Sequence, residues 1–289
     1  MLSENIKGTK MKKFAIFVLT HGRGETMTTD VALRGCGYKG KIYYVIDNTD
    51  KQKDAYERRC YDGDEVLVFD KEKTAGETDY GDNSGNRAAV IFARNAVYEL
   101  AREKGVEAFA MMDDDITGFS YRVTNEGRSA GQERRLCDFD SYCEIMAKFL
   151  RSTGFVFVGM SHGGDWIGGI ESRAVRRFWR EGASNVFFCL TEKAVRWKGG
   201  ANEDMATGLV ENCRGNVAIS ILPVMCKEKV FSGASGGMTP LYEKISRYVQ
   251  LFVPILYCPT AIRLTIGAGG KVTQRLIRDR IMPKIIKYI

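Results

Sequence analysis

Three consecutive aspartates, Asp113, Asp114 and Asp115, directly follow the apolar segment 109–112. Adjacent carboxylates repel one another and are costly to desolvate, so a buried strand that ends in three of them needs a compensating cation. Carboxylate oxygens are ligands that Mg2+ and Mn2+ prefer, and such ions commonly bridge a protein carboxylate to the phosphates of a substrate. The triplet therefore predicts a metal–diphosphate site at the carboxyl end of a central strand, where open α/β sheets usually bind ligands. The alternatives are a solvated acidic turn and a helix N-cap.

The elements that must position this triplet are visible in the N-terminal part of the chain. Continuous apolar runs, as expected for strands buried on both faces, alternate there with helix-like segments. The strands are predicted at residues 14–19, 41–46, 65–69 and 108–112, and the helix before the triplet at residues 87–104. This alternation argues for a parallel sheet with right-handed crossovers, and thus for a nucleotide-binding type of α/β half.

The rest of the chain is less regular. Strands are predicted at residues 155–158, 186–190 and 217–222, and helices at residues 138–151 and 205–210. Residues 70–86 and 120–136 are polar and contain glycines, so both are predicted to be loops, the second one mobile. Residues 263–289 form a basic terminal segment with seven lysines and arginines and one aspartate.

The composition suits one large α/β domain, or one domain with an elaboration, because 44% of the 289 residues are hydrophobic. No run of about 18 apolar residues occurs, so no membrane-spanning helix is expected. The net charge of +7 fits a polyanionic partner without establishing one. The eight cysteines form no Cys-x-x-Cys pair and there are two histidines, so a zinc site is not expected. Without a secretion signal, we expect reduced thiols and a cytoplasmic location.

The polar ends of the predicted strands, taken in chain order, resemble the nucleotide-sugar half of family 2 glycosyltransferases with the GT-A fold. The features are Thr20-His21-Gly22-Arg23 after the first strand, Asp47 and Asp50 after the second, the helical Ala93-Arg94-Asn95-Ala96, and the aspartate triplet. The resemblance implies an α/β protein of the GT-A class, which has a Rossmann-like mixed sheet. Its N-terminal half would bind the nucleotide-sugar and its C-terminal half the acceptor.

The resemblance also implies roles for single residues. Asp115 would bind a Mn2+ or Mg2+ ion that offsets charge on the departing UDP, and His162 would be an additional metal or diphosphate ligand. Asp47 would contact the uracil, and Asp113 the ribose. The other nucleotide-sugar-binding candidates are Thr20, His21, Arg23, Arg94 and Asp114. A salt bridge on the helix surface is the alternative for Arg94, a helix cap for Asp114 and a structural place for His162.

A second acidic motif, Glu203-Asp204, precedes the helix-like stretch 205–210. In the GT-A fold a Glu-Asp motif at this place lies near the acceptor and supplies the general base. An acceptor hydroxyl is a poor nucleophile at pH 7, and a positioned carboxylate that takes its proton contributes typically about 10²–10⁴-fold. By resemblance, Asp204 is therefore the first catalytic candidate and Glu203 the second. An N-terminal helix cap is the alternative, and both roles can hold at once.

The full set of motifs narrows the resemblance to the phage TET-associated glycosyltransferases. Further matching motifs are Ile167-Gly168-Gly169, Asn202-Glu203-Asp204 and Gly236-Gly237, so the resemblance covers residues 14–240. These enzymes are associated with DNA-modification systems that hydroxylate the 5-methyl group of pyrimidines. The resemblance implies transfer of a sugar to 5-hydroxymethylcytosine in DNA, in the cytoplasm of an infected bacterium. The implied donor is a UDP-sugar, such as UDP-glucose or UDP-N-acetylglucosamine.

Two basic segments are candidates for contact with DNA. Arg173, Arg176, Arg177 and Arg180 fall at i, i+3, i+4 and i+7, so in a helix they would make one continuous stripe that suits phosphates. The alternative is a solvated face, or salt bridges with Glu171 and Glu181. The second candidate is the segment 263–289. Three tryptophans could stack a base flipped out of the duplex, with core packing as the alternative, and these are Trp166, Trp179 and Trp197.

The predicted organisation is an N-terminal extension (1–12), a nucleotide-sugar-binding half (13–120), an acceptor-binding and catalytic half (121–245) and a basic C-terminal segment (246–289). Two alternatives stay open. One is a GT-A glycosyltransferase that acts on a glycan or protein acceptor, and the other is a non-catalytic nucleic-acid-binding protein whose aspartates only cap a helix. Metal-dependent binding of UDP would separate the enzymes from the latter. The sequence leaves open which sugar is transferred and with which stereochemical outcome. It also leaves open whether the acceptor is 5-hydroxymethylcytosine or 5-hydroxymethyluracil, and the oligomeric state.

Overall fold

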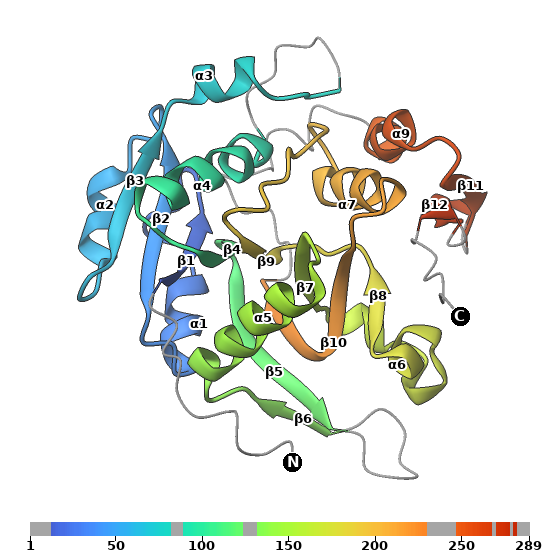
Figure 1. The fold of residues 1–289 in the computed structure, drawn as a ribbon, viewed down its shortest axis with the longest axis horizontal. Helices are drawn as coiled ribbons and strands as arrows, with labels where there is room; N and C mark the ends of the chain where they lie inside the picture. Colours follow the sequence, from blue (N-terminus) through green and yellow to red (C-terminus); the bar gives the residue numbers. More distant parts are fainter. Residues whose placement is uncertain are drawn as a thin grey trace.

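A ten-stranded mixed sheet lies at the centre of the protein (Figure 1). The structure is a computed structural model that describes residues 13–81, 89–123, 132–229, 247–267, 270–277 and 280–281, without the side chains of residues 123, 132, 170, 173 and 247. The strands are β1 (Phe14–Leu19), β2 (Lys41–Asp47), β3 (Glu65–Phe69), β4 (Ala108–Asp113), β5 (Ile116–Val123), β6 (Gln132–Arg135), β7 (Phe157–Ser161), β8 (Trp179–Glu181), β9 (Val186–Leu190) and β10 (Ala218–Glu228). Their order is β3-β2-β1-β4-β9-β7-β10-β5-β6, and β8 pairs with β10.

One half of this sheet is parallel and the other is mixed. β1 pairs in parallel with β2 and β4, and β2 pairs in parallel with β3. β9 then runs antiparallel to both β4 and β7, while β10 is parallel to β7 and antiparallel to β5. The apolar runs of β7 and β9 are buried along their whole length, as strands covered on both faces must be. The predicted class, a mixed α/β sheet of the GT-A type, is confirmed by this arrangement.

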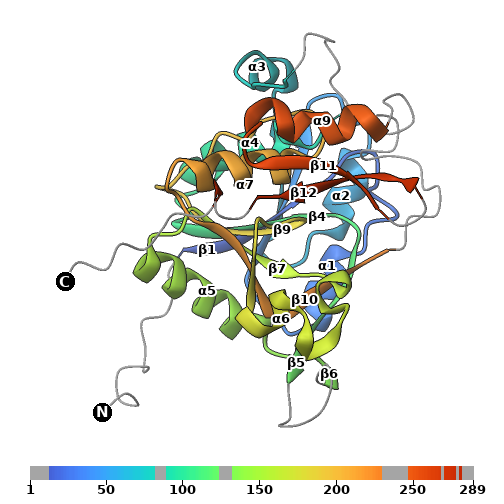
Figure 2. The ribbon, with the colours of Figure 1, turned by 90° about the vertical axis from the view of Figure 1, so that its right-hand side faces the viewer.

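Helices cover both faces of the sheet. They are α1 (Thr29–Gly35), α2 (Lys53–Arg59), α3 (Lys71–Gly76), α4 (Ile91–Glu103), α5 (Phe139–Thr153), α6 (Arg173–Arg177), α7 (Glu203–Cys213) and α9 (Arg247–Tyr257), with short 3-10 turns η1 (Gly163–Trp166) and η2 (Gly169–Glu171). Figure 2 shows α1 and α5 on one side of the sheet, and α4, α7 and α9 on the other. Two cores result: Leu33 of α1 and Met146 of α5 pack in one, and Phe92 of α4 in the other. Among the described residues, no helix is both long and apolar enough to cross a bilayer.

The C-terminal elements pack against α7. A two-stranded hairpin, β11 (Ile262–Ile266) and β12 (Val272–Leu276), follows α9. Leu209 and Val210 of α7 form a small core with Cys258 and Ile262, and the Asn202 side chain donates to the Gln250 carbonyl over 2.7 Å. The C-terminal elements therefore adjoin the start of α7, where the acidic pair Glu203-Asp204 lies.

The predicted elements agree best with the structure where the sequence is apolar. β1, β3 and β9 have the predicted bounds, and α5 lies at the predicted place. The two predicted loops are wrong in part: residues 70–86 contain α3, and residues 120–136 contain the end of β5 and its partner β6. α3 buries no residue, so it offers no hydrophobic periodicity to detect. The division of the chain at residues 120 and 245 stays a prediction, and the sheet itself joins both halves because β4 pairs with β9.

Candidate active site

The aspartate triplet lies at the turn between β4 and β5. Asp113 is the last residue of β4, and Ile116 begins β5, so a strand and not a helix follows. The helix-cap alternative for the triplet is therefore wrong. Two hydrogen bonds tie the turn to the start of α1: the Thr29 hydroxyl donates to the Asp113 carbonyl over 2.7 Å, and the Thr28 N–H donates to the Asp114 carbonyl over 2.9 Å. The three carboxylates thus lie at the carboxyl end of a central strand, as their sequence predicts.

Asp113 is compensated by Arg94 of α4. The Arg94 side chain is fully buried; its Nη2 donates to Asp113 Oδ1 and its Nε to Glu203 Oε1, each over 3.0 Å. Its guanidinium also packs against the rings of Phe187 and Trp197, with Cζ at 4.5 and 5.2 Å from the ring centroids. The surface salt bridge predicted as the alternative for Arg94 is therefore wrong. Arg94 instead joins the end of β4 to the start of α7.

Asp114 is compensated by the loop that follows β1. Its side chain is buried, its Oδ2 accepts from the Thr20 hydroxyl, and its Oδ1 accepts from Arg23 Nη1, each over 2.7 Å. The Arg23 backbone N–H donates in turn to the Tyr56 hydroxyl over 2.9 Å. Thr20 and Arg23 thus hold Asp114 in place, which excludes the helix cap suggested for Asp114. Their contact with a nucleotide stays a prediction.

Asp115 has no salt bridge among the residues that the structure describes. Burial raises its pKa, and the charges of Asp114 and Glu228 raise it further, although Arg23 lowers it. Burial likewise raises the pKa of Asp113, to about 8. Arg94 lowers this pKa, but the charges of Asp115 and Glu203 raise it and add to the effect of burial. Two of the three aspartates are therefore held by arginines, and Asp115 is the one left without a fixed cation.

This environment fits a hard divalent cation. A partly buried carboxylate whose charge is opposed by its neighbours gains most from a cation beside it. Carboxylate oxygens are the ligands of Mn2+ and Mg2+ in proteins. The oxygens of Asp115 therefore suit either ion, which agrees with the role predicted for this residue.

Asp47, at the end of β2, is held by a histidine and a lysine. Its Oδ2 lies 2.8 Å from His21 Nδ1 and 2.9 Å from Lys71 Nζ, and the Thr49 hydroxyl donates to Oδ1. Burial opposes ionisation, but these hydrogen bonds outweigh it and lower the pKa of Asp47, while the bond to Asp47 raises the pKa of His21. Asp47 is thus ionised at neutral pH and can only accept hydrogen bonds. Lys71 was not predicted, because it begins α3 in a segment expected to be a loop.

Glu203 and Asp204 begin α7. Asn202 precedes them in a left-handed conformation, with φ of 50°. Glu203 is buried and bound to Arg94, whereas Asp204 is half-buried and its Oδ1 accepts from the Met205 N–H over 2.7 Å. Within the described residues, Asp204 has no salt bridge. The carboxylate of Asp204 is therefore the one in this pair that remains available to take a proton.

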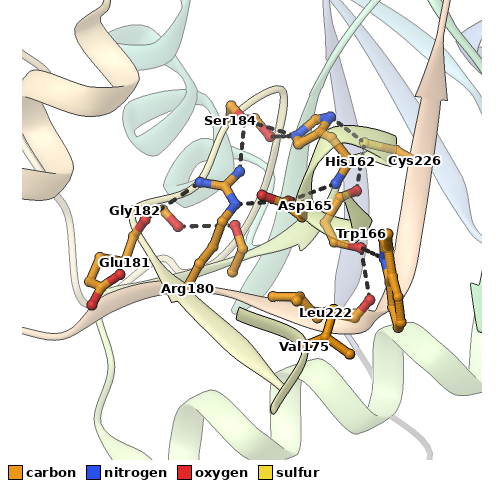
Figure 3. Close-up of polar contacts among 12 residues, drawn as sticks. His162, Asp165, Trp166, Val175, Arg180, Glu181, Gly182, Ser184, Leu222 and Cys226 are labelled. Atoms are coloured by element: carbon orange, nitrogen blue, oxygen red, sulfur yellow. Dashed lines mark hydrogen bonds and ion pairs between the residues drawn. The ribbon is translucent and has the colours of Figure 1, made fainter. Parts of the chain in front are cut away.

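His162 follows β7 and lies in a polar network (Figure 3). Its Nδ1 lies 2.7 Å from Oε1 of Glu228, at the end of β10, and its Nε2 lies 2.8 Å from the Ser184 hydroxyl. The His162 N–H and Arg180 Nε both donate to Asp165 Oδ2, over 3.0 and 2.9 Å. The sequence indicated His162 but not Glu228. A weaker signal was present, because β10 ends in an acidic residue as β4 does, although Lys227 separates Glu228 from the apolar residues.

The predicted arginine stripe is not continuous. α6 ends at Arg177 because Phe178 adopts a left-handed conformation with φ of 60°, and Arg180 lies on β8. The side chain of Arg173 lies outside the described part of the chain. The other three arginines form ion pairs: Arg176 with Glu171, Arg177 with Glu181, and Arg180 with Asp165. Arg180 thus belongs to the His162 network. Salt bridges with Glu171 and Glu181, the predicted alternative, are confirmed for Arg176 and Arg177, whereas Arg180 pairs with Asp165.

The tryptophans lie mainly in the cores. Trp166 and Trp197 are 5% and 1% exposed, so core packing is confirmed for both, and they are not placed to stack a flipped base. Trp179 is partly buried, with the guanidinium of Arg177 5.0 Å from its ring centroid. The motif Gly236-Gly237 lies outside the described residues.

The large mixed sheet with helices on both faces is the fold class that the GT-A resemblance implies. Residues 14–237 match the TET-Associated Glycosyltransferase family, so the chain belongs to this family, as its motifs predict. No protein of curated function gives a significant match. Among solved structures, the apo form of mouse xyloside xylosyltransferase 1 is similar, with a TM-score of 0.38 and 12% identity over 62% of this chain and 68% of that chain.

Proposed function

We propose that the protein transfers a sugar from a UDP-sugar to the hydroxymethyl group of 5-hydroxymethylcytosine in DNA, with a divalent cation at Asp115. The observation that carries the proposal is the difference in charge compensation among the three aspartates of the triplet. Asp113 and Asp114 each have an arginine, and Asp115 has no salt bridge in the described residues. A structural acidic turn would gain stability from compensating all three, whereas a site for a cation that arrives with its substrate needs one carboxylate left over.

The nucleotide would lie across the ends of β1, β2 and β4. Asp47 is an ionised acceptor there, held by His21 and Lys71, and suits the N3–H donor of uracil. His21 is partly exposed, and its bond to Asp47 raises its pKa and so favours the charged form, which suits a neighbouring phosphate or ribose oxygen. A cation held by Asp115 would supply positive charge to the diphosphate as it departs.

The transfer step itself would use Asp204. The acceptor hydroxyl oxygen forms a bond to the anomeric carbon, the bond from that carbon to the UDP oxygen breaks, and the hydroxyl proton passes to the Asp204 carboxylate. Arg94 supports this step at a distance. Because it binds both Asp113 and Glu203, it fixes the start of α7, and so the position of Asp204, relative to the end of β4.

The DNA partner is supported by the distribution of cations that have no acidic partner. In the described residues, Arg263, Lys271 and Arg275 of the β11–β12 hairpin are exposed and make no salt bridge. Arg263 and Arg275 lie directly opposite each other, and like charges so placed destabilise a strand pair. An anion between them would remove that cost, and DNA offers a row of phosphates. The hairpin therefore suits DNA better than the α6–β8 segment, whose arginines are already paired.

The experiment is a transfer assay on defined DNA. The protein is incubated with Mn2+, a panel of UDP-sugars, and duplexes that contain either 5-hydroxymethylcytosine or 5-methylcytosine, followed by mass spectrometry of the nucleosides. We expect the mass of one hexose or N-acetylhexosamine on hydroxymethylcytosine and none on methylcytosine, with loss of transfer in EDTA and strongly reduced transfer in Asp204→Asn. Transfer to a glycan or protein but to none of the duplexes would refute the DNA acceptor.

A further inference from the structure

We propose that the outer surface formed by α9 and the β11–β12 hairpin binds DNA as an unpaired strand, with bases stacked on the rings of Tyr248 and Phe252 and phosphates held by the hairpin. The inference rests on the proposed function, because it assumes that the acceptor is DNA. It goes further by naming the form of the DNA that is bound. These elements lie in residues 247–277, after the segment 14–237 that matches the family, so the family match carries no information about this surface.

One face of α9 is apolar and exposed. Tyr248, Phe252 and Leu256 are 60%, 48% and 63% exposed, and their spacing of four residues places them in one row along the helix. We call these three residues the apolar row of α9. Val253 and Cys258, on the remaining side of the helix, are buried. A contiguous row of large apolar side chains in water typically marks a surface that binds a partner.

The arginines of the hairpin point away from α7, as the apolar row does. Ile262 and Leu276 belong to one hydrophobic core with Leu209 of α7, so this face of the hairpin is turned toward α7. Successive residues of a strand point to opposite faces, so Arg263 and Arg275 point away from α7. α9 packs on the same core from its buried side. Figures 1 and 2 show α9 and the hairpin side by side at the outside of the molecule, where rings and arginines form one surface.

The charge of this surface favours a nucleic acid over a second copy of the chain. Residues 247–277 contain four basic residues and no acidic one. A second copy seated on the apolar row would bring the cations of both hairpins toward one another, and like charges that face each other across an interface are unfavourable. A nucleic acid strand offers what both parts of the surface need. Its phosphates suit the hairpin, and the flat faces of its bases stack on aromatic rings whatever the base sequence.

The surface begins beside the residues proposed to act in the transfer. The Asn202 side chain donates to the Gln250 carbonyl over 2.7 Å, and Asn202 directly precedes the acidic pair at the start of α7. Tyr248 lies two residues before Gln250, so the apolar row starts at the same end of α7 as the proposed general base, Asp204. Bases on the row would therefore be neighbours of the nucleotide that receives the sugar. That nucleotide must leave a duplex to be reached, which is easiest where the strand is already unpaired.

The test compares three fluorescein-labelled oligonucleotides of one length by fluorescence anisotropy: a single strand of mixed sequence, its duplex, and an abasic strand that keeps the phosphates but has no bases. We expect the protein to bind the mixed single strand most tightly. Tyr248→Ala and Phe252→Ala should each weaken binding of that strand about five- to 150-fold, the usual effect of losing one stacked base. Binding of the abasic strand, and the slope of log affinity against log salt, should not change, because no phosphate contact is lost.

Two further variants control this test. Tyr61→Ala also removes an exposed ring, 72% exposed, but Tyr61 follows α2 on the opposite side of the molecule from α9 (Figure 1), so DNA binding should not change. Phe252→Trp keeps a ring at the same place and should keep the affinity for the single strand. The mixed strand should also quench the added tryptophan fluorescence, and the abasic strand should not. This readout remains if an alanine variant fails to fold, which circular dichroism would show.

The contrary results separate this inference from the proposed function. Unchanged affinity for the mixed strand in folded alanine variants, or an equal loss for the mixed and abasic strands, would refute base stacking on α9 and leave the DNA acceptor standing. No binding of any of the three oligonucleotides would refute the DNA partner as well. The alanine variants could instead lose a dimer seen by sedimentation velocity, or binding to phosphatidylserine vesicles, with DNA affinity unchanged. That result would assign the apolar row to a second copy or to a lipid surface, and overturn the inference.

Discussion

Arg94 donates to Asp113 over 3.0 Å, from a helix buried on one face of the sheet to the end of its central strand. The same guanidinium binds Glu203, so its removal would leave the buried carboxylate of Glu203 and the partly buried one of Asp113 without this partner. We expect Arg94→Met to lower the free energy of unfolding by about 3–5 kcal/mol, as when one partner of a buried ion pair is lost. Urea denaturation measures this, with Arg102→Met on the exposed side of the same helix as the control. Equal losses in the two variants would show that other groups compensate Asp113 and Glu203.

Asp204→Asn should keep the binding of UDP-sugar and reduce turnover by about 10²-fold or more, because it removes a general base. Glu203→Gln should act differently, since Glu203 is bound to Arg94, and we expect it mainly to reduce stability. Steady-state kinetics and thermal denaturation of both variants separate these effects. Near-normal turnover in Asp204→Asn with a severe loss in a folded Glu203→Gln would transfer the base role to Glu203.

Asp115→Asn should abolish the Mn2+ dependence of UDP binding while the fold survives, because within the described residues the Asp115 side chain makes no salt bridge. Calorimetric titration of UDP with and without Mn2+ provides the measurement. Asp54→Asn, on the exposed first turn of α2, is the control and should behave as the natural protein does. Metal-dependent UDP affinity that persists in Asp115→Asn would rule out this residue as a ligand.

The pKa of His21 should lie above its ordinary value of 6.5, because its imidazolium is hydrogen-bonded to Asp47. Asp47→Asn should therefore lower the pKa of His21, and Lys71 nearby would lower it further. Since the folded-state pKa is raised, the stability that the pair adds is present below pH 6.5 and disappears as the pH rises through the raised value. NMR titration measures this directly, because the chain has only one other histidine, His162, which serves as the internal control. An unchanged His21 pKa in Asp47→Asn would contradict the pairing.

Replacing Arg263 and Arg275 together by glutamine should weaken DNA binding and flatten the dependence of log affinity on log salt by about 0.9 per lost phosphate contact. The double variant Arg176→Gln/Arg177→Gln should change the slope little, because both arginines are already paired with glutamates. Fluorescence anisotropy at several salt concentrations gives both slopes. A flattened slope in the second variant and not in the first would return the DNA surface to α6.

The buried apolar strands and the aspartate triplet were determined by the sequence by itself, whereas β6 and Glu228 at the end of β10 were not. Continuous apolar runs set the bounds of β1 and β9, because a strand buried on both faces is apolar along its length. The edge strand β3 also has its predicted bounds, although Val68 is exposed. Asp113 at the end of β4 and Glu203 at the start of α7 were also readable, because each follows or precedes such an apolar segment. These features are local, and the resemblance of their order to a known family was sufficient to predict the fold class.

Only the tertiary structure decided which of these carboxylates is free. Asp113 is paired with a residue 19 positions away, Asp114 with one 91 positions away, and Glu203 with one 109 positions away. The sheet order brings β10 next to β5, and so Glu228 next to Asp115. The basic stripe at 173–180 looked continuous in sequence, but a left-handed Phe178 divides it, and acidic residues neutralise its described arginines. Charge compensation depends on distances through space, which the order of residues along the chain does not specify.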